Sequence, residues 1–338
     1  MKAVGLHQYL PIDHPDSLLD VELPTPQPAE HDLLVRIEAI AVNPVDTKVR
    51  APKAHREEQP RVLGWDAAGV VEAVGGAVTL FKPGDRVFYA GSIIRPGCNA
   101  ELQVVDERIA GRMPASLSFA EAAALPLTTL TAWESLFDRL HIDTTGKDAG
   151  KSLLIVGGAG GVGSIAIQLA KQVAGLRVVT TASREASARW CRELGADDII
   201  DHNGDMVAQA KALGVAQFDY IACFNDTDAH FPAMASLIRP LGTIVTIVEN
   251  ARPIQVELLK AKSAAFAWEF MFTRSSFQTP DMIEQHRLLN HVGQLIDAGR
   301  IRTTLGERLG PINATNLKRA HKALEAGHVV GKLVLEGF

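Results

Sequence analysis

Short apolar segments alternate with turn-forming residues through the first third of the chain. Residues 33–40 partly alternate between apolar and polar positions, and residues 69–75 form an apolar run closed by glycines, so both are predicted to be strands. Pro83 and Gly84 predict a turn into a third strand, and the prolines within residues 23–28 predict an extended connector. Many short strands joined by turns predict a small barrel or sandwich.

The pattern changes near Ser118. Residues 119–140 are rich in Ala and Leu and predict a helix with a break at Pro126. After Gly150, strands are predicted at 152–156, 177–181, 198–200, 218–223, 243–248 and 264–272, with helices at 165–174 and 185–194 between the first three. This alternation is typical of a doubly wound parallel sheet covered by helices on both faces. Two amphipathic helices, 282–298 and 314–326, and a strand at 331–335 follow.

The length of 338 residues suggests two domains. We predict a β-rich domain at residues 1–127, a nucleotide-binding domain at 128–272 and a return to the first domain at 273–338. The charged fraction of 22% is ordinary, and the net charge of -5 gives no basic face for nucleic acid. No long apolar run suggests a signal peptide or membrane span. Three scattered cysteines without a C-x-x-C pair predict a reducing, cytoplasmic setting.

The most informative segment is the glycine-rich stretch at residues 157–163. Gly158, Gly160 and Gly163 satisfy G-x-G-x-x-G between a predicted strand and an apolar helix, the context in which this motif binds dinucleotides. Glycine lets backbone N–H groups approach a pyrophosphate, and the helix N-terminus favours the anion. The alternative without a binding role is a flexible loop that binds nothing. We assign cofactor binding to the loop residues Gly158, Gly160, Gly161, Val162 and Gly163.

The end of the second strand of this unit predicts which dinucleotide binds. An acid there would bind the ribose 2′-hydroxyl of NAD, but this chain has no acid before Glu185. Ser183 and Arg184 instead offer a hydroxyl and a guanidinium to the 2′-phosphate of NADPH. Ser183 as a helix N-cap beside a solvated Arg184 is the alternative, and both can hold.

With these segments in hand, the chain resembles the medium-chain dehydrogenases/reductases, nearest to the quinone oxidoreductases and the group called zinc-binding alcohol dehydrogenase family proteins. The resemblance rests on the glycine loop and on residues 41–46, 62–69, 125–134 and 269–274. It implies a Rossmann domain inserted into a GroES-like catalytic domain, and a homodimer formed through the Rossmann sheets.

The resemblance also implies where a catalytic zinc would be bound. In zinc-dependent relatives a Cys, a His and a second Cys hold the metal, and these positions align with Asn43, Trp65 and Leu127. None of these is an ordinary zinc ligand, and Cys98 alone cannot rebuild the relatives' structural zinc loop. We therefore predict no metal.

Several single residues are candidates for catalysis or substrate binding. Asn43 could donate its amide to a developing oxyanion and Asp46 could orient Asn43 or the ribose, although Asn43 with Pro44 could equally form a turn that Asp46 caps. Trp65 and Phe272 are assigned to the substrate pocket, with plain core packing as the alternative for Trp65. Related enone reductases use a Tyr after the Asn-Pro pair; residues 47–52 contain none, so water is the expected proton donor, with Lys48 as a substitute.

Four further residues are cofactor candidates. By resemblance, Thr131 lies near the nicotinamide and His202 against the adenine, while Asn225 follows a strand at the carboxyl edge where such sheets bind ligands. Lys332, on the returning strand, is also assigned to the cofactor. The alternatives without a role in binding are a solvated loop for His202, a plain turn for Asn225 and a surface position for Lys332.

The function predicted from these observations is a zinc-free, NADPH-dependent oxidoreductase that transfers hydride to a quinone or another α,β-unsaturated carbonyl. Conjugation spreads the negative charge that develops in such acceptors, so they need less help from a Lewis acid than a simple ketone does. A zinc-dependent alcohol dehydrogenase and a non-catalytic NADPH-binding protein are the alternatives, and the glycine loop is compatible with all three.

Overall fold

The computed structural model describes all residues, 1–338, and divides them into two compact units. Unit 1 consists of Met1–Leu127 and Phe272–Phe338, and unit 2 of Thr128–Met271. The second unit is therefore inserted into the first along the chain. The predicted domain boundaries differ from these units by one residue, because Phe272 is part of unit 1.

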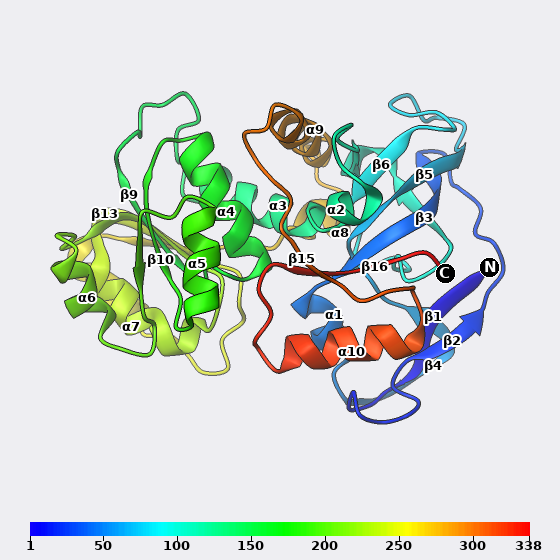
Figure 1. Ribbon diagram of the computed structural model, residues 1–338, viewed down its shortest axis with the longest axis horizontal. Coiled ribbons are helices and arrows are strands. Elements are labelled where there is room, and N and C mark those ends of the chain that lie inside the picture. The colour runs from blue at the N-terminus through cyan, green and yellow to red at the C-terminus, as the bar shows by residue number, and fades with distance from the viewer. The chain divides into compact units, whose positions relative to one another are not determined.

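Unit 2 contains a six-stranded parallel sheet, in which helices follow most strands (Figure 1). The strands are β9 (Ser152–Val156), β10 (Arg177–Thr181), β11 (Asp198–Ile200), β12 (Phe218–Cys223), β13 (Ile238–Thr246) and β14 (Ala265–Trp268). The helices between them are α4 (Gly161–Gln172), α5 (Glu185–Glu193), α6 (Met206–Ala212) and α7 (Thr227–Leu237). The spatial order β11-β10-β9-β12-β13-β14 reverses direction between β9 and β12, which is the doubly wound Rossmann arrangement predicted from the sequence.

The core of the Rossmann sheet is apolar on both faces. Every residue from Leu153 to Val156 of β9 is fully buried, as expected for a central parallel strand. Helices α4 and α5 cover one face and α6 and α7 the other (Figure 1). On the second of these faces Met206, Phe231 and Met234 pack against Phe218 and Ile221.

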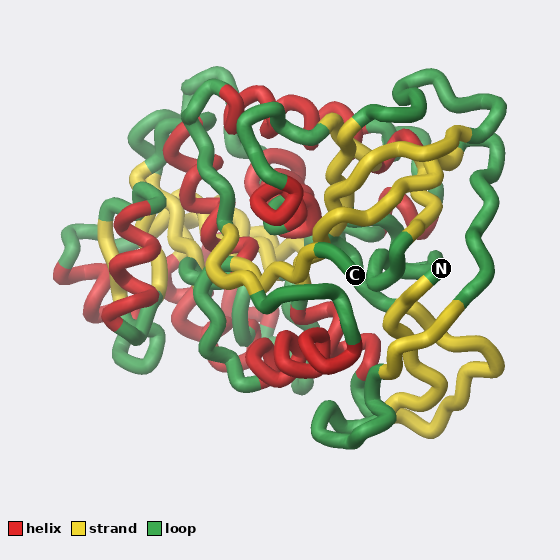
Figure 2. The backbone as a smooth tube through the Cα atoms, turned by 45° about the vertical axis from the view of Figure 1, so that its right-hand side comes forward, coloured by secondary structure: helices red, strands yellow, loops and turns green.

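Unit 1 is the β-rich part of the chain and contains two sheets, whose strands are yellow in Figure 2. The smaller sheet has the order β2-β1-β4, formed by β2 (Leu19–Glu22), β1 (Lys2–Tyr9) and β4 (Lys53–Val62). The larger follows the order β15-β16-β3-β5-β6-β8, with β7 also paired to β3. Its strands are β3 (Asp32–Val42), β5 (Ala67–Val74), β6 (Arg86–Tyr89), β7 (Leu102–Asp106), β8 (Ala110–Arg112), β15 (Leu305–Arg308) and β16 (Lys332–Glu336).

The helices of unit 1 are short at the start of the chain and longer at its end. They are α1 (Pro44–Arg50), α2 (Phe119–Ala123), α8 (Thr273–Phe277), α9 (Glu284–Asp297) and α10 (Ala314–Glu325). Helix α3 (Pro126–Trp133) begins in unit 1 and continues into unit 2, where a π-helical segment (Glu134–Arg139) follows it. Two 3₁₀ segments lie at Glu107–Ile109 and Val256–Lys262. The predicted return of the chain to the first domain is confirmed by the pairing of β16 with β3.

The predicted break at Pro126 is confirmed: α2 ends at Ala123 and α3 begins at Pro126, because proline is favoured in the first turn of a helix. Other elements differ from their predicted bounds. The predicted strand at 264–272 is only Ala265–Trp268, and β13 begins five residues earlier than expected. None of the helices combines the length and the apolar character that a membrane span requires.

Candidate functional sites in the two units

The glycine loop of unit 2 lies between β9 and α4, where the sequence placed it. Helix α4 begins at Gly161, within the motif, with Gly160 as its extended N-cap. The N–H groups of the first helical turn, at Gly161, Val162 and Gly163, have no acceptor inside the helix. They form an anion-binding helix N-terminus at the carboxyl edge of the sheet.

Each glycine of the motif meets a different steric demand. A Cβ built on Gly158 would lie 2.0 Å from Thr180 Oγ1, and one on Gly163 would lie 2.2 Å from the carbonyl oxygen of Gly157. A Cβ on Gly160 would meet nothing closer than 3.7 Å. Gly158 and Gly163 are therefore required by the protein's own packing, whereas the space at Gly160 is open to a ligand. This open cradle beside a helix N-terminus fits a dinucleotide pyrophosphate.

The last residue of β10 bonds the glycine loop and the residue before it bonds strand β9, two roles that sequence reasoning missed. Thr181 Oγ1 accepts a hydrogen bond from the N–H of Gly157 at 2.9 Å, and Gly157 has a φ of 92°. The Thr180 hydroxyl donates to the carbonyl of Ile155 at 2.8 Å. Both threonines are buried; the Thr181 hydroxyl serves the loop, and the Thr180 hydroxyl ties β10 to β9. Two adjacent threonines at the end of a buried strand were the available signal.

The residues after β10 are exposed. Ser183 and Arg184 both face solvent, and Arg184, not Ser183, is the N-cap of α5. The alternative assignment of Ser183 as the cap is therefore wrong. Position 184 caps only through its backbone, because its side chain makes no capping bond.

Two other cofactor candidates of unit 2 lie at the carboxyl edge of the sheet. Asn225 is the second residue after β12, and its Cβ would be 3.1 Å from a Cβ added to Gly157. His202 follows β11, and its ring meets that of His230 edge-on at 5.8 Å. The buried Nδ1 of His202 has no hydrogen-bond partner, and burial lowers the pKa of His230. The third candidate, Thr131, is buried on α3.

In unit 1 the structure brings Asn43, Asp66 and Lys332 together. Lys332 Nζ lies 2.9 Å from Asp66 Oδ2 and 3.0 Å from the carbonyl of Val42, and it also donates to Asn43 Oδ1. Asn43 Nδ2 donates to Asp66 Oδ2 at 2.8 Å. We call Asn43, Asp66 and Lys332 the buried polar triad, because their exposed fractions are 1%, 0% and 3%. Asp66 was not predicted as a site residue.

The triad changes what two predicted residues can do. The amide of Asn43 is already used by Asp66, with Trp65 O at 3.4 Å as a further acceptor, so donation to a substrate oxyanion would need it to leave these bonds. The ammonium of Lys332, which has three N–H donors, makes three hydrogen bonds inside unit 1, and its assignment to the cofactor stays a prediction.

Asp46 caps helix α1, as the structural alternative for it proposed. Its Oδ2 accepts the backbone N–H of Asn43, which satisfies a donor at the N-terminus of α1. Its other oxygen, Oδ1, is buried and has no partner. Burial raises the pKa of Asp46 to about 7, opposed by the hydrogen bond from Asn43 and by the charge of Lys332.

The two predicted substrate residues, Trp65 and Phe272, pack against each other. Their rings meet at 6.1 Å and 75°, and Trp65 donates its indole N–H to the carbonyl of Ser92 at 3.2 Å. Trp65 is 1% exposed and Phe272 is 2% exposed. Arg274, in the segment after Phe272, forms an ion pair with Asp281 at 3.0 Å.

The residues at the positions of the relatives' zinc ligands do not fit a zinc ion. Asn43 is held by Asp66 and Lys332, Trp65 offers only an indole, and Leu127 offers only an apolar side chain. No group of three or more His, Cys, Asp or Glu side chains is placed to hold a metal.

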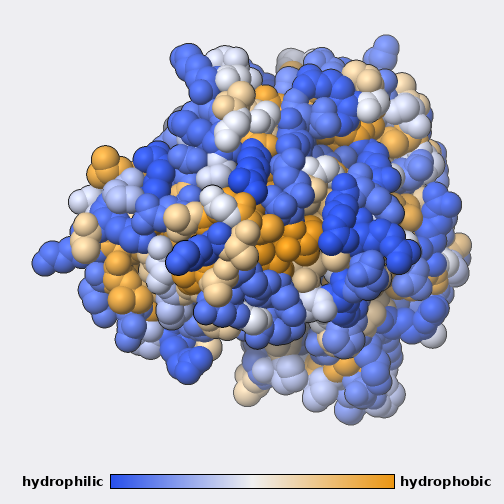
Figure 3. Space-filling model, turned by 60° about the vertical axis from the view of Figure 1, so that its left-hand side comes forward, coloured by the Kyte–Doolittle hydropathy of each residue, from blue (hydrophilic) through white to orange (hydrophobic).

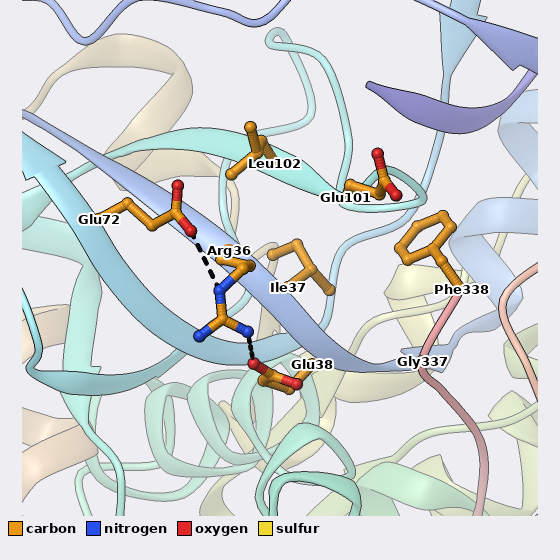
Figure 4. A pocket seen from close by; sticks show the side chains of 8 residues that line it. All are labelled: Arg36, Ile37, Glu38, Glu72, Glu101, Leu102, Gly337 and Phe338. Carbon is orange, nitrogen blue, oxygen red and sulfur yellow. Dashed lines mark hydrogen bonds and ion pairs between the residues drawn. The ribbon is translucent and has the colours of Figure 1, made fainter.

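A shallow surface pocket of unit 1 carries no catalytic groups (Figure 4). Arg36 lies between two glutamates and pairs with Glu72 at 3.0 Å and with Glu38. The pocket is lined by Arg36, Ile37, Glu38, Glu72, Glu101, Leu102, Gly337 and Phe338. Its cation is thus neutralised by neighbouring carboxylates, and we assign no ligand to it.

Comparison with known proteins agrees with both units. Residues 29–133 match the alcohol dehydrogenase GroES-like domain, and residues 194–335 match a family described as zinc-binding dehydrogenase. A zinc-type alcohol dehydrogenase-like protein of Staphylococcus aureus is 44% identical over 336 residues, covering 99% of both chains.

Two solved structures are similar over the whole chain. The crystal structure of a proposed zinc-dependent alcohol dehydrogenase from Rhizobium etli is 52% identical, with a TM-score of 0.95, and covers 100% of this chain and 98% of its own. Escherichia coli quinone oxidoreductase complexed with NADPH is 25% identical, with a TM-score of 0.83, over 99% of this chain and 100% of its own. The fold, the glycine loop and these similarities together show that the chain belongs to the medium-chain dehydrogenase/reductase superfamily of oxidoreductases.

Proposed function

We propose that this protein uses NADPH to reduce a quinone or another α,β-unsaturated carbonyl without a metal ion. Two observations together carry the proposal. The glycine cradle fits a dinucleotide, and the residues at the relatives' zinc-ligand positions, Asn43, Trp65 and Leu127, do not fit zinc. The similarity to a quinone oxidoreductase complexed with NADPH supports the same cofactor and acceptor class.

The preference for NADPH over NADH rests on the residues that follow β10. Thr181 bonds the glycine loop and Thr180 bonds strand β9, and the exposed Ser183 and Arg184 come before the first acid, Glu185. A 2′-phosphate would find a guanidinium and a hydroxyl here, and no acid lies between the end of β10 and Arg184.

The bound nicotinamide would supply the hydride, and the chain supplies position and electrostatics. The helix N-terminus at Gly161–Gly163 and the open cradle at Gly160 hold the pyrophosphate. Conjugated acceptors spread the charge that hydride addition creates, so a donor as strong as a metal is not needed. Because the amide of Asn43 is used by Asp66, we propose that solvent donates the final proton.

The names of the similar proteins favour a second candidate, an alcohol dehydrogenase that binds zinc. It requires a metal site that the residues at 43, 65 and 127 do not offer. Purified protein with stoichiometric zinc and alcohol oxidation would support this candidate over the proposed one.

We further propose that the protein is a cytoplasmic homodimer. Its three cysteines are all unpaired, in keeping with a reducing compartment. Strand β14 lies at the edge of the Rossmann sheet, and an open edge can pair with that of a second copy. Trp268, at the end of this strand, is 49% exposed, and Figure 3 shows apolar groups reaching the surface among polar ones.

The proposed function is tested by following NADPH oxidation with a panel of quinones, enones, simple ketones and aldehydes. We expect turnover with the conjugated acceptors, and NADPH to be preferred over NADH. The Gly160→Asp variant is the control, because it places a carboxylate in the cradle and should abolish cofactor binding. Tight NADPH binding without turnover on any acceptor would contradict the enzymatic assignment.

A further inference from the structure

Lys332 is a buried cation whose hydrogen bonds all end within unit 1. It begins β16, near the end of the chain, and reaches Val42 and Asn43 at the end of β3 and Asp66 in the loop before β5. The ion pair with Asp66 spans 2.9 Å, and its two side chains are 3% and 0% exposed. Such a lysine is rare inside a protein unless it is paired.

Asp66 accepts hydrogen bonds on both oxygens. Oδ2 accepts from Lys332 and from Asn43 Nδ2, while Oδ1 accepts the backbone N–H of Leu127 at 2.7 Å. Because every partner is a donor, the arrangement suits the ionised carboxylate. Burial raises the pKa of Asp66, and the nearby ammonium opposes that rise. Lys332 thus keeps Asp66 charged where burial alone would favour its neutral form.

The ion pair between Lys332 and Asp66, with its hydrogen bonds, joins three segments that are distant in sequence. Asn43 begins the turn into α1, Asp66 follows Trp65, and Leu127 is the second residue of α3. Residues 43, 65 and 127 are also the positions at which zinc-dependent relatives carry ligands. A metal bound there would join the same three segments, and here they are joined by an ion pair with its hydrogen bonds.

The loop that carries Asp66 is built for this contact. Gly64 has a φ of 105°, a conformation that residues with a Cβ rarely adopt. A Cβ at this position would lie 2.3 Å from Asn99 Oδ1 and 2.9 Å from the sulfur of Cys98. Gly64 therefore allows the tight turn that brings Asp66 beneath Asn43 and Leu127.

We propose that Lys332 is a positioning residue that takes the place of the absent catalytic metal: its ammonium, through Asp66, fixes Asn43 and the start of α3. Only the kinetic part of its test rests on the proposed function. The hydrogen bonds of this network join residues of unit 1 alone, whereas the glycine cradle is formed by residues of unit 2, so Lys332 is proposed to act on the geometry of the reaction and not on cofactor affinity.

The test compares Lys332→Met, Asp66→Asn and the double variant with the wild-type protein, using thermal unfolding, NADPH binding and kcat. Lys332→Met leaves a buried carboxylate unpaired and should lower Tm most, whereas the double variant, with a neutral pair, should regain part of that loss. We expect kcat to fall by about tenfold or more in both Lys332→Met and the double variant, since small misplacements slow reactions strongly. The dissociation constant of NADPH should stay within about threefold, because no cofactor contact is removed.

Lys82→Met is the matched control, because Lys82 is exposed on unit 1 and lies outside the network. It should change neither Tm nor kcat. A Lys332→Met variant with the Tm and kcat of the wild-type protein would overturn the proposal. Weaker NADPH binding with an unchanged kcat would also overturn it, because that result would indicate that the ammonium contacts the cofactor. If Lys332→Met does not fold, the measurements on the double variant test the proposal instead. A double variant that does not fold, or one that folds and has the kcat of the wild-type protein, would also overturn the proposal. If the wild-type protein reduces no acceptor, the proposed function fails and the unfolding measurements alone decide the inference.

Discussion

The hydroxyl of Thr181 accepts a hydrogen bond from the backbone N–H of Gly157 at 2.9 Å, and so ties the end of β10 to the first residue of the glycine loop. The N–H of Gly158 also points to the carbonyl of Thr181, at 3.3 Å. The loop conformation that exposes the N-terminus of α4 is therefore fixed by the neighbouring strand.

Replacing Thr181 by Val should weaken NADPH binding because the N–H of Gly157 loses its buried acceptor. A lost hydrogen bond of this kind costs about 1 kcal/mol, or roughly a fivefold rise in the dissociation constant. Fluorescence titration with NADPH measures the change. Thr181→Ser keeps the hydroxyl and is the control; equal weakening in both variants would show that the methyl group, not the hydroxyl, matters.

The glycines at 158 and 160 should respond differently to alanine. Gly158→Ala forces a methyl group to 2.0 Å from Thr180 Oγ1 and should destabilise the protein by about 1–3 kcal/mol. Gly160→Ala meets no atom within 3.5 Å and should leave Tm unchanged while weakening NADPH binding, because the methyl group fills the cradle. Denaturant unfolding and NADPH titration separate the two effects. A stable Gly158→Ala variant would show that the loop is looser than described.

Arg184 should decide between the two nicotinamide dinucleotides. Removing its guanidinium in Arg184→Ala should weaken NADPH binding about tenfold and leave NADH binding nearly unchanged, because only NADPH carries the 2′-phosphate. Arg189→Ala, on the exposed side of the same helix, is the matched control. Equal losses for both cofactors would exclude a contact with the 2′-phosphate.

The buried carboxyl of Asp46 should make stability depend on pH. Its pKa in the folded protein, about 7, exceeds the ordinary 3.8, so the folded state holds a proton between these values that the unfolded chain has released. Stability should therefore fall as the pH rises from about 4 to 7, with a slope of at most about 1.4 kcal/mol per pH unit. Asp46→Asn should remove this slope in urea unfolding, while Asp16→Asn, at an exposed carboxyl, should keep it. A slope unchanged in Asp46→Asn would assign the proton to another group.

The edge strand β14 predicts how the protein self-associates. Trp268→Arg should convert the dimer into a monomer in light scattering, because a charge would be buried at the paired edge. Val207→Arg, at an exposed position of α6, should leave the dimer intact. A wild-type monomer at micromolar concentration would contradict the proposal.

Local patterns in the sequence were enough to predict unit 2. Its strands contain short apolar runs, and the glycine motif fixes where β9 ends and α4 begins. Helices α6 and α7 were both missed, and α7 contains Pro232. In unit 1, β4 was missed because nearly all of its residues are polar or exposed, so no apolar period marks it.

The buried polar triad could not be derived from sequence spacing. Lys332 lies 289 positions from Asn43 and 266 from Asp66, and only the pairing of β16 with β3 brings them together. The one local signal was a lysine at the start of the apolar run 333–335, which suggests a buried charge with a distant partner.

The most direct test of metal-free reduction by NADPH is to measure the zinc content and the quinone-dependent NADPH oxidation of the same sample before and after exhaustive chelation. The proposed chemistry predicts far less than one zinc ion per chain and a kcat/KM unchanged by the chelator. One zinc ion per chain, with activity that chelation removes and added zinc restores, would contradict it.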